Sequence, residues 1–125
     1  MKHIFTLAFL AASVAMMAQV GLITWEVNMA NETVSPDGVF LAGGDYFGLP
    51  GDNPMADDDG DGVWTITMAM PLNYTGAYTF TNGACLNYSC KENIIGQSCA
   101  FGIWSDRELP LVTGDATYST CFSQC

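Results

Sequence analysis

The chain has 125 residues, of which 50% are hydrophobic, and its 13 acidic against three basic side chains give a formal net charge of −10. This charge excludes nucleic acid and anionic membrane surfaces as expected partners, because both repel an acidic protein. The length suffices for one domain with a modest hydrophobic core.

Residues 1–18 have the pattern of a secretory signal peptide. Lys2 precedes an apolar run at residues 4–17 that is shorter than a membrane-spanning helix, and we expect cleavage after Ala18. No second apolar stretch of that length follows, so no membrane span is expected. The sequence therefore predicts a protein that is secreted or held at the cell surface, with one domain at residues 19–125.

Short segments with alternating apolar and polar residues follow one another along the rest of the chain, and turn signals separate them. At residues 22–29 and 63–70 apolar side chains occupy every second position, which is typical of half-buried strands. In chain order, the expected strands are residues 22–29, 39–42, 63–70, 78–81, 109–112 and 116–122. No apolar stripe at helical spacing occurs among them, so the pattern predicts an all-β fold, an antiparallel β-sandwich.

All five cysteines lie in the C-terminal third of the chain, and in an exported protein they are expected to form disulfides. Cys85 and Cys90 are close enough to close a small loop, and Cys99 has Cys121 or Cys125 as a partner. The candidates for bonds within the chain are Cys85, Cys90, Cys99 and Cys121. The odd number leaves one thiol, so either Cys125 forms a disulfide between chains or the chain continues beyond it. A zinc site is the alternative, but residues 19–125 contain no histidine.

Residues 57–62 read Asp-Asp-Asp-Gly-Asp-Gly, which matches the first half of a calcium-binding loop. In such a loop alternate side chains converge on one ion, and Gly62 allows the sharp turn around it. The expected Ca²⁺ ligands are three carboxylates and one main-chain carbonyl, those of Asp57, Asp59, Asp61 and Val63.

The second half of that loop departs from the pattern. Its twelfth position holds Met68 instead of a bidentate Glu, so a more distant carboxylate such as Asp45 or Asp52 has to complete the coordination. The alternative is a solvated acidic turn that binds no ion.

Residues 19–125 lack the histidine that most acid–base and nucleophilic catalytic sites use. Without histidine, Ser-His and Cys-His arrangements are excluded. Glu92, Asp106 and Glu108 remain as a carboxylate set for acid–base chemistry, but a domain of this size has little room for a deep cleft. We therefore predict that the protein is not an enzyme.

Several short motifs follow one another in an order found in a known family. They lie at residues 27–29, 34–39, 42–45, 53–55, 59–64, 78–83 and 121–125. This order resembles the exported immunoglobulin-like domains of Bacteroidetes-type bacteria that are related to starch- and glycogen-binding modules. The resemblance implies an early-set, immunoglobulin-like β-sandwich and a non-catalytic function in binding an α-glucan or another polysaccharide.

Glucan-binding members of that family present exposed tryptophans, and this chain departs from them. Trp25 and Trp64 fall on inward-facing positions of their strands and are expected in the core. The expected glycan-stacking side chains are the loop aromatics Tyr46, Phe47 and Trp104. The expected partner is a polysaccharide or an extracellular or cell-surface protein, and the alternative function is a structural or adhesive assembly domain without a small-ligand site.

Overall fold

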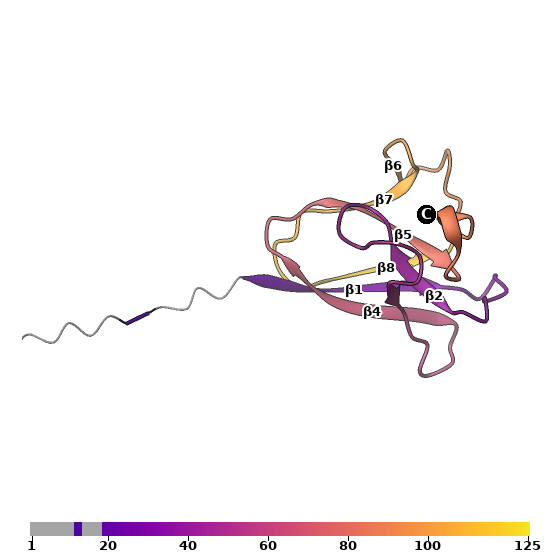
Figure 1. Ribbon diagram of the computed structural model, residues 1–125, viewed down its shortest axis with the longest axis horizontal. Helices are drawn as coiled ribbons and strands as arrows, with labels where there is room; N and C mark the ends of the chain where they lie inside the picture. Colours follow the sequence, from indigo (N-terminus) through magenta and orange to yellow (C-terminus); the bar gives the residue numbers. More distant parts are fainter. Residues whose placement is uncertain (1–11, 14–18) are drawn as a thin grey trace, which may run out of the picture.

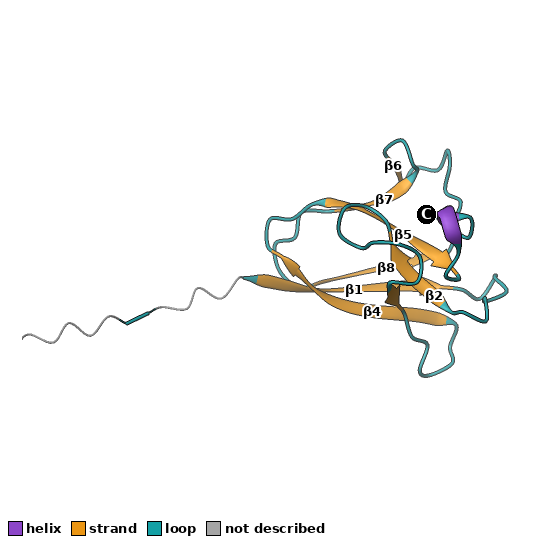
Figure 2. Cartoon of the chain, viewed as in Figure 1, coloured by secondary structure: helices purple, strands orange, loops and turns teal. Residues whose placement is uncertain are grey.

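The computed structural model describes residues 12–13 and 19–125, so the expected signal peptide falls almost wholly outside the described residues. In this part of the chain, no helix is long and apolar enough to cross a membrane. The described residues form eight strands and one short 3₁₀ helix, η1, Leu86–Tyr88 (Figure 2). The strands are β1 Val20–Asn28, β2 Val39–Ala42, β3 Asn53–Pro54, β4 Val63–Pro71, β5 Gly76–Asn82, β6 Ala100–Phe101, β7 Asp106–Leu109 and β8 Ala116–Cys121.

The strands form two sheets that pack face to face. One sheet has the order β4-β1-β8 and the other the order β3-β2-β5-β7-β6. Figure 1 shows β4, β1 and β8 of the first sheet side by side, with β5 and β7 of the second sheet beyond them. The prediction of an all-β sandwich stapled by disulfides is confirmed.

Strand β1 shows how the sequence builds the core between these sheets. Its alternation places Ile23, Trp25 and Val27 inward, where each is fully buried. The Trp25 ring meets Phe47 edge to face at a centroid distance of 5.2 Å and Tyr78 at 5.9 Å. Burial of each large apolar side chain stabilises the fold by about 1.5–3 kcal/mol, so this aromatic cluster anchors the two sheets to each other.

One pairing within the smaller sheet differs from the antiparallel prediction. Strand β8 runs parallel to β1, with Trp25 opposite Tyr118, whereas β4 runs antiparallel to β1. The chain leaves β7 in the larger sheet and crosses the sandwich before β8 begins, so β8 enters the smaller sheet in the same direction as β1. Alternation of apolar residues carries no information about strand direction, which is why the sequence did not reveal it.

One strand prediction needs correction, and two strands were not predicted. The strand expected at residues 109–112 lies at β7, Asp106–Leu109, and ends before Pro110, which has no N–H for a sheet ladder. Strands β3 and β6 contain two residues each. They were missed because two residues are too few to show an alternating pattern.

The disulfides confirm one expected bond and correct another. Cys85 is bonded to Cys90, and Cys99 is bonded to Cys125. Within the described chain Cys121 is free and half-buried. The expectations that Cys121 pairs within the chain and that Cys125 is left for a bond between chains are therefore wrong.

The C-terminal tail explains this choice of partner. Cys121 ends β8 opposite Asn28, and the chain then turns away from the sheet. Gln97 accepts a hydrogen bond from the N–H of Cys125 at 2.9 Å and donates one to the carbonyl of Ser123 at 2.9 Å. These two bonds bring Cys125 beside Cys99.

A buried ion pair fastens the same tail to the sandwich. Arg107 and Glu92 form a bidentate pair, with N···O distances of 2.6 and 2.8 Å, and their side chains are 6% and 0% exposed. Arg107 also donates to the carbonyls of Cys121 and Gln124. A buried charge pair is stable only when such additional hydrogen bonds satisfy its remaining polar atoms.

Candidate functional site

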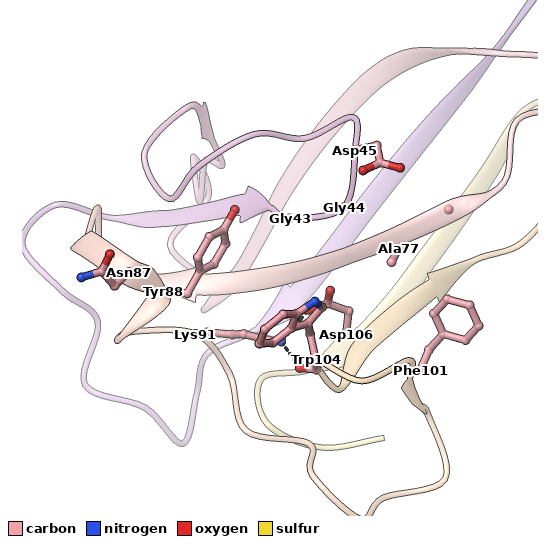
Figure 3. Close-up of a pocket in the computed structure, with 11 residues that line it drawn as sticks. Gly43, Gly44, Asp45, Ala77, Asn87, Tyr88, Lys91, Phe101, Trp104 and Asp106 are labelled. Atoms are coloured by element: carbon pink, nitrogen blue, oxygen red, sulfur yellow. Dashed lines mark hydrogen bonds and ion pairs between the residues drawn. The ribbon is translucent and has the colours of Figure 1, made fainter.

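A groove with a volume of about 720 Å³ lies over the larger sheet. This volume falls within the range of roughly 300–1,000 Å³ that small-molecule sites occupy. The groove is bounded by three loops and floored by β5 (Figure 3). Its lining residues are Gly43, Gly44, Asp45, Gly76, Ala77, Asn87, Tyr88, Lys91, Phe101, Trp104 and Asp106.

The floor depends on small residues of β5. Successive strand residues face opposite sides of a sheet, so Ala77 faces the groove while its neighbour Tyr78 is buried in the core. The Gly43-Gly44 turn lies directly against this floor. A Cβ on Gly44 would lie 2.1 Å from the carbonyl oxygen of Ala77, and Gly44 has a φ of +57°. Glycine at this position therefore lets the turn form the rim of the groove.

One wall carries two exposed aromatic rings. Phe101 ends β6 and Trp104 lies in the loop that joins β6 to β7, and they are 44% and 76% exposed. The ammonium of Lys91 fixes this loop, since it donates to the carbonyl of Trp104 and pairs with the Asp106 carboxylate, each at 2.5 Å. Trp104 thus combines a large accessible apolar face with a fixed backbone, a combination typical of a binding surface.

The opposite wall is the ring of residues 85–90, which the Cys85–Cys90 disulfide closes. Within it Asn87 and Tyr88 have φ values of 54° and 57°, a left-handed conformation that is rare for a large side chain. The Tyr88 hydroxyl donates to the carbonyl of Gly48 at 2.7 Å and so ties this wall to the loop that follows β2. Strained residues of this kind persist where surrounding contacts hold them, and they concentrate at functional sites.

The charges around this wall act on the Tyr88 hydroxyl. Burial raises the pKa of Tyr88, and the negative charges of Asp106 and Asp52 raise it further. The hydroxyl therefore stays protonated as a hydrogen-bond donor over a wider pH range than a free tyrosine.

The structure separates the three aromatic residues that the sequence proposed for stacking. Trp104 is exposed in the groove. Tyr46 is 41% exposed but lies outside the lining, with its ring 5.3 Å from that of Tyr74. Phe47 is 1% exposed, so the expectation that it stacks on a ligand is wrong. Its carbonyl accepts a hydrogen bond from the Asn53 side chain, which folds the loop back and turns the Phe47 ring into the core.

Sequence reasoning missed two aromatic side chains of the groove, Tyr88 and Phe101. A signal for each was present in the sequence. Tyr88 lies between two cysteines five residues apart, and a short disulfide ring has no interior in which to hide a side chain. Phe101 lies three residues before Trp104, next to Gly102.

Most of the carboxylates proposed for acid–base chemistry are engaged in other contacts. Glu92 is buried against Arg107, and Asp106 is paired with Lys91. Glu108 is exposed on β7. Two of the three candidate carboxylates are therefore held in ion pairs with Lys91 and Arg107.

The structure does bring the three predicted calcium-ligating carboxylates together. Ligand atoms of Asp57, Asp59 and Asp61 lie within 4.8 Å of one another. Asp57 accepts hydrogen bonds from the N–H groups of Asp61 and Gly62, both at 3.1 Å, and Asp61 accepts one from Val63 at 2.8 Å. These bonds shape the loop into a turn that points carboxylates toward one centre.

The same turn changes the acidity of Asp59. The hydrogen bond from the N–H of Asp61 lowers the pKa of Asp59, but burial, the Asp61 charge and the side-chain hydrogen bonds of Asp61 and Asp57 together raise it above its ordinary value. A raised pKa is the expected result when like charges are crowded.

The distant carboxylates expected to complete the calcium shell are not part of this cluster. Asp52 accepts a hydrogen bond from the N–H of Leu49 at 2.9 Å, and Asp45 lies at the groove. The cluster thus supplies three carboxylates of the roughly six to eight oxygen ligands that Ca²⁺ takes.

No protein-family model matches this chain, and no curated protein matches it at a significant level. An assignment of function therefore has to be argued from the groove itself.

Proposed function

We propose that the protein is a secreted, non-catalytic carbohydrate-binding domain that holds a segment of polysaccharide in the groove over β5. The observation that carries this proposal is the exposed indole of Trp104, which lines the groove together with Phe101 and Asp106. A flat aromatic face packs well against the apolar C–H face of a pyranose ring, and nearby polar groups bond its hydroxyls.

The groove is organised before a ligand arrives, which supports this function. Lys91 fixes the backbone of Trp104, and the 85–90 disulfide and the Tyr88–Gly48 hydrogen bond fix the other wall. A preformed site loses less conformational entropy on binding than a flexible one. The resemblance of the sequence to immunoglobulin-like domains related to starch- and glycogen-binding modules places α-glucans among the polysaccharides to be tested.

Export is part of the same proposal. The signal-like segment at residues 1–18 and the two disulfides are both compatible with an extracellular protein, since disulfides persist in oxidising compartments. A polysaccharide on or outside a cell is then accessible to the groove.

The proposal is tested by measuring binding of residues 19–125 to soluble starch, to glycogen and to a glycan array. We expect Trp104→Ala to weaken binding about tenfold, the loss of one good aromatic contact. Tyr46→Ala is the matched control, because Tyr46 is an exposed aromatic residue outside the groove, and it should bind like the unmodified domain. The absence of any bound glycan would refute the function, and equal binding by Trp104→Ala would refute the site.

A structural or adhesive assembly domain is the second candidate. It is favoured by three large apolar side chains of the cysteine-rich part, Leu86, Ile95 and Ile103, which are 84%, 76% and 88% exposed. Single exposed apolar residues are common, but exposure this high in three large side chains supports a contact surface. Sedimentation velocity over a wide concentration range distinguishes the candidates, because an assembly domain associates and Ile103→Asp should then abolish the association.

A further inference from the structure

The balance of charge around the groove restricts which glycan it favours. Two ion pairs occur in the described part of the chain, Lys91–Asp106 and Arg107–Glu92. They engage the only basic side chains of residues 19–125, against 13 acidic residues. Every cationic side chain of the described domain is thus already bound to a carboxylate, and none is free to receive an anionic ligand.

The groove itself contains an acidic group in addition to its aromatic rings. Figure 3 shows Asp45 on the opposite side of the β5 ribbon from Trp104, with Ala77 between them. Asp45 is exposed and is not part of either ion pair. A ligand that lies on Ala77 and contacts the Trp104 ring therefore has a carboxylate at its other edge.

These two groups suit a positively charged substituent. An ammonium near Asp45 gains a charge-assisted hydrogen bond, and a cation near the Trp104 face gains a cation–π contact. A carboxylated or sulfated sugar is repelled by Asp45 and by the net negative field of the domain. A neutral sugar gains the stacking contact and hydrogen bonds to its hydroxyls, but neither of the contacts that need a positive charge.

On these grounds, we infer that the groove selects glycans that carry free amino groups, such as chains of glucosamine units, over neutral and acidic glycans. This inference rests on the proposed carbohydrate-binding function and names the ligand class of the same groove. Asp45 is the residue that determines the selectivity, while Trp104 supplies the contact that all glycans share.

The test compares four probes by isothermal titration calorimetry at about pH 5.5, where amino groups are protonated. The probes are a glucosamine oligosaccharide, its fully N-acetylated counterpart of equal length, a malto-oligosaccharide and poly-lysine. We expect the glucosamine oligosaccharide to bind about fivefold more tightly than the two neutral sugars at low salt, and this advantage to shrink as salt is added.

Two variants locate the effect. Asp45→Asn should lower the affinity for the amino sugar to the level of the neutral sugars and so remove the preference. Asp37→Asn makes the same change in net charge at an exposed turn outside the groove and should keep the preference. An equal loss of preference in both variants would overturn the role of Asp45 in favour of a general charge effect.

The remaining outcomes are also decisive. Equal affinity for amino and N-acetylated sugars, with binding still dependent on Trp104, would overturn this inference and leave the proposed function intact. Poly-lysine that competes as strongly as the amino sugar would overturn it in favour of a basic peptide ligand. Failure of all three sugars to bind, with no glycan bound on the array either, would refute the proposed function instead.

Discussion

The ammonium of Lys91 lies 2.5 Å from the backbone carbonyl oxygen of Trp104, and it spans two segments that are distant in the sequence. Lys91 follows the disulfide ring that forms one wall of the groove, and Trp104 is on the loop that forms the other. The dashed lines in Figure 3 mark how this one side chain holds Trp104 and Asp106 together. The position of the exposed indole therefore depends on a single positive charge.

Replacement of that charge is expected to weaken glycan binding more than it weakens the fold. Lys91→Met keeps the length of the side chain but frees the Trp104 loop, and we expect the affinity to fall about threefold to tenfold with a stability loss of about 1 kcal/mol. Calorimetry measures the affinity, and quenching of tryptophan fluorescence reports the exposure of the loop. Lys91→Arg keeps a positively charged donor and serves as the control. Unchanged affinity in Lys91→Met would show that the hydrogen bond from Lys91 to the Trp104 carbonyl has no role in binding.

The two disulfides are expected to affect stability and binding differently. The Cys85–Cys90 bond spans five positions and the Cys99–Cys125 bond 26. In the chain-entropy model, removal of the shorter bond costs about 2 kcal/mol and removal of the longer about 3.5 kcal/mol. Urea unfolding of the Cys85→Ser/Cys90→Ser and Cys99→Ser/Cys125→Ser variants checks this order.

Removal of the shorter bond should weaken glycan binding more than removal of the longer bond. The reason is that only the shorter bond closes the groove wall that carries Tyr88. The shorter bond's variant is expected to bind several times more weakly, and the longer bond's variant to bind normally at temperatures where it remains folded. Similar binding by both variants would mean that the 85–90 ring does not organise the groove.

Stability is expected to fall at alkaline pH through Tyr78. Burial raises the pKa of Tyr78 to about 12, with Arg107 opposing the rise and Glu92 adding to it. The folded state therefore holds the phenolic proton more strongly than the unfolded state, whose reference value is 10.0. This contribution is complete below pH 10 and is lost as the pH approaches 12, by roughly 2–3 kcal/mol.

The variant Tyr78→Phe keeps the ring in the core and removes the titrating group. Urea unfolding at about pH 9 and about pH 11.5 should show a smaller loss of stability for the variant than for the unmodified domain. An identical loss in the two proteins would assign the alkaline effect to other groups.

Calcium binding by the 57–62 turn has a direct thermal test. If three converging carboxylates bind Ca²⁺ with the weak affinity of extracellular sites, about 10 mM Ca²⁺ should stabilise the fold by about 1–3 kcal/mol. Differential scanning fluorimetry with Ca²⁺, with Mg²⁺ and with a chelator measures the shift, and Asp59→Asn should abolish it. A melting temperature that does not respond to Ca²⁺ or to the chelator would exclude the ion.

The sequence predicted the strands well and the loops poorly, and the aromatic residues show why. Trp25 was expected in the core from the alternation of its strand, and it is fully buried. Tyr46 and Phe47 lie in a loop, where no period links neighbouring side chains, and one is exposed while the other is buried. Which of the two turns inward depends on the Asn53 hydrogen bond, a contact between loop residues that no local pattern reports.

For the cysteines, the short-range disulfide could be predicted from the sequence, but the partner of Cys99 in the C-terminal tail could not. The Cys85–Cys90 bond was predicted because the chain between them is short. The choice between Cys121 and Cys125 depends on Gln97 and Arg107, which hold the tail from other parts of the fold. Tertiary contacts of this kind have to be seen in a structure.

The parallel ladder between β1 and β8 has a consequence for how the domain is made. It pairs the first strand of the sandwich with the last, so the edge of β1 that faces away from β4 finds its partner only in residues 116–121. A chain that emerges with its amino end first cannot complete this sheet until nearly all of it has been released. Contacts of such long sequence separation slow folding, and β1 exposes an unpaired edge during that delay, when chaperone protection matters most.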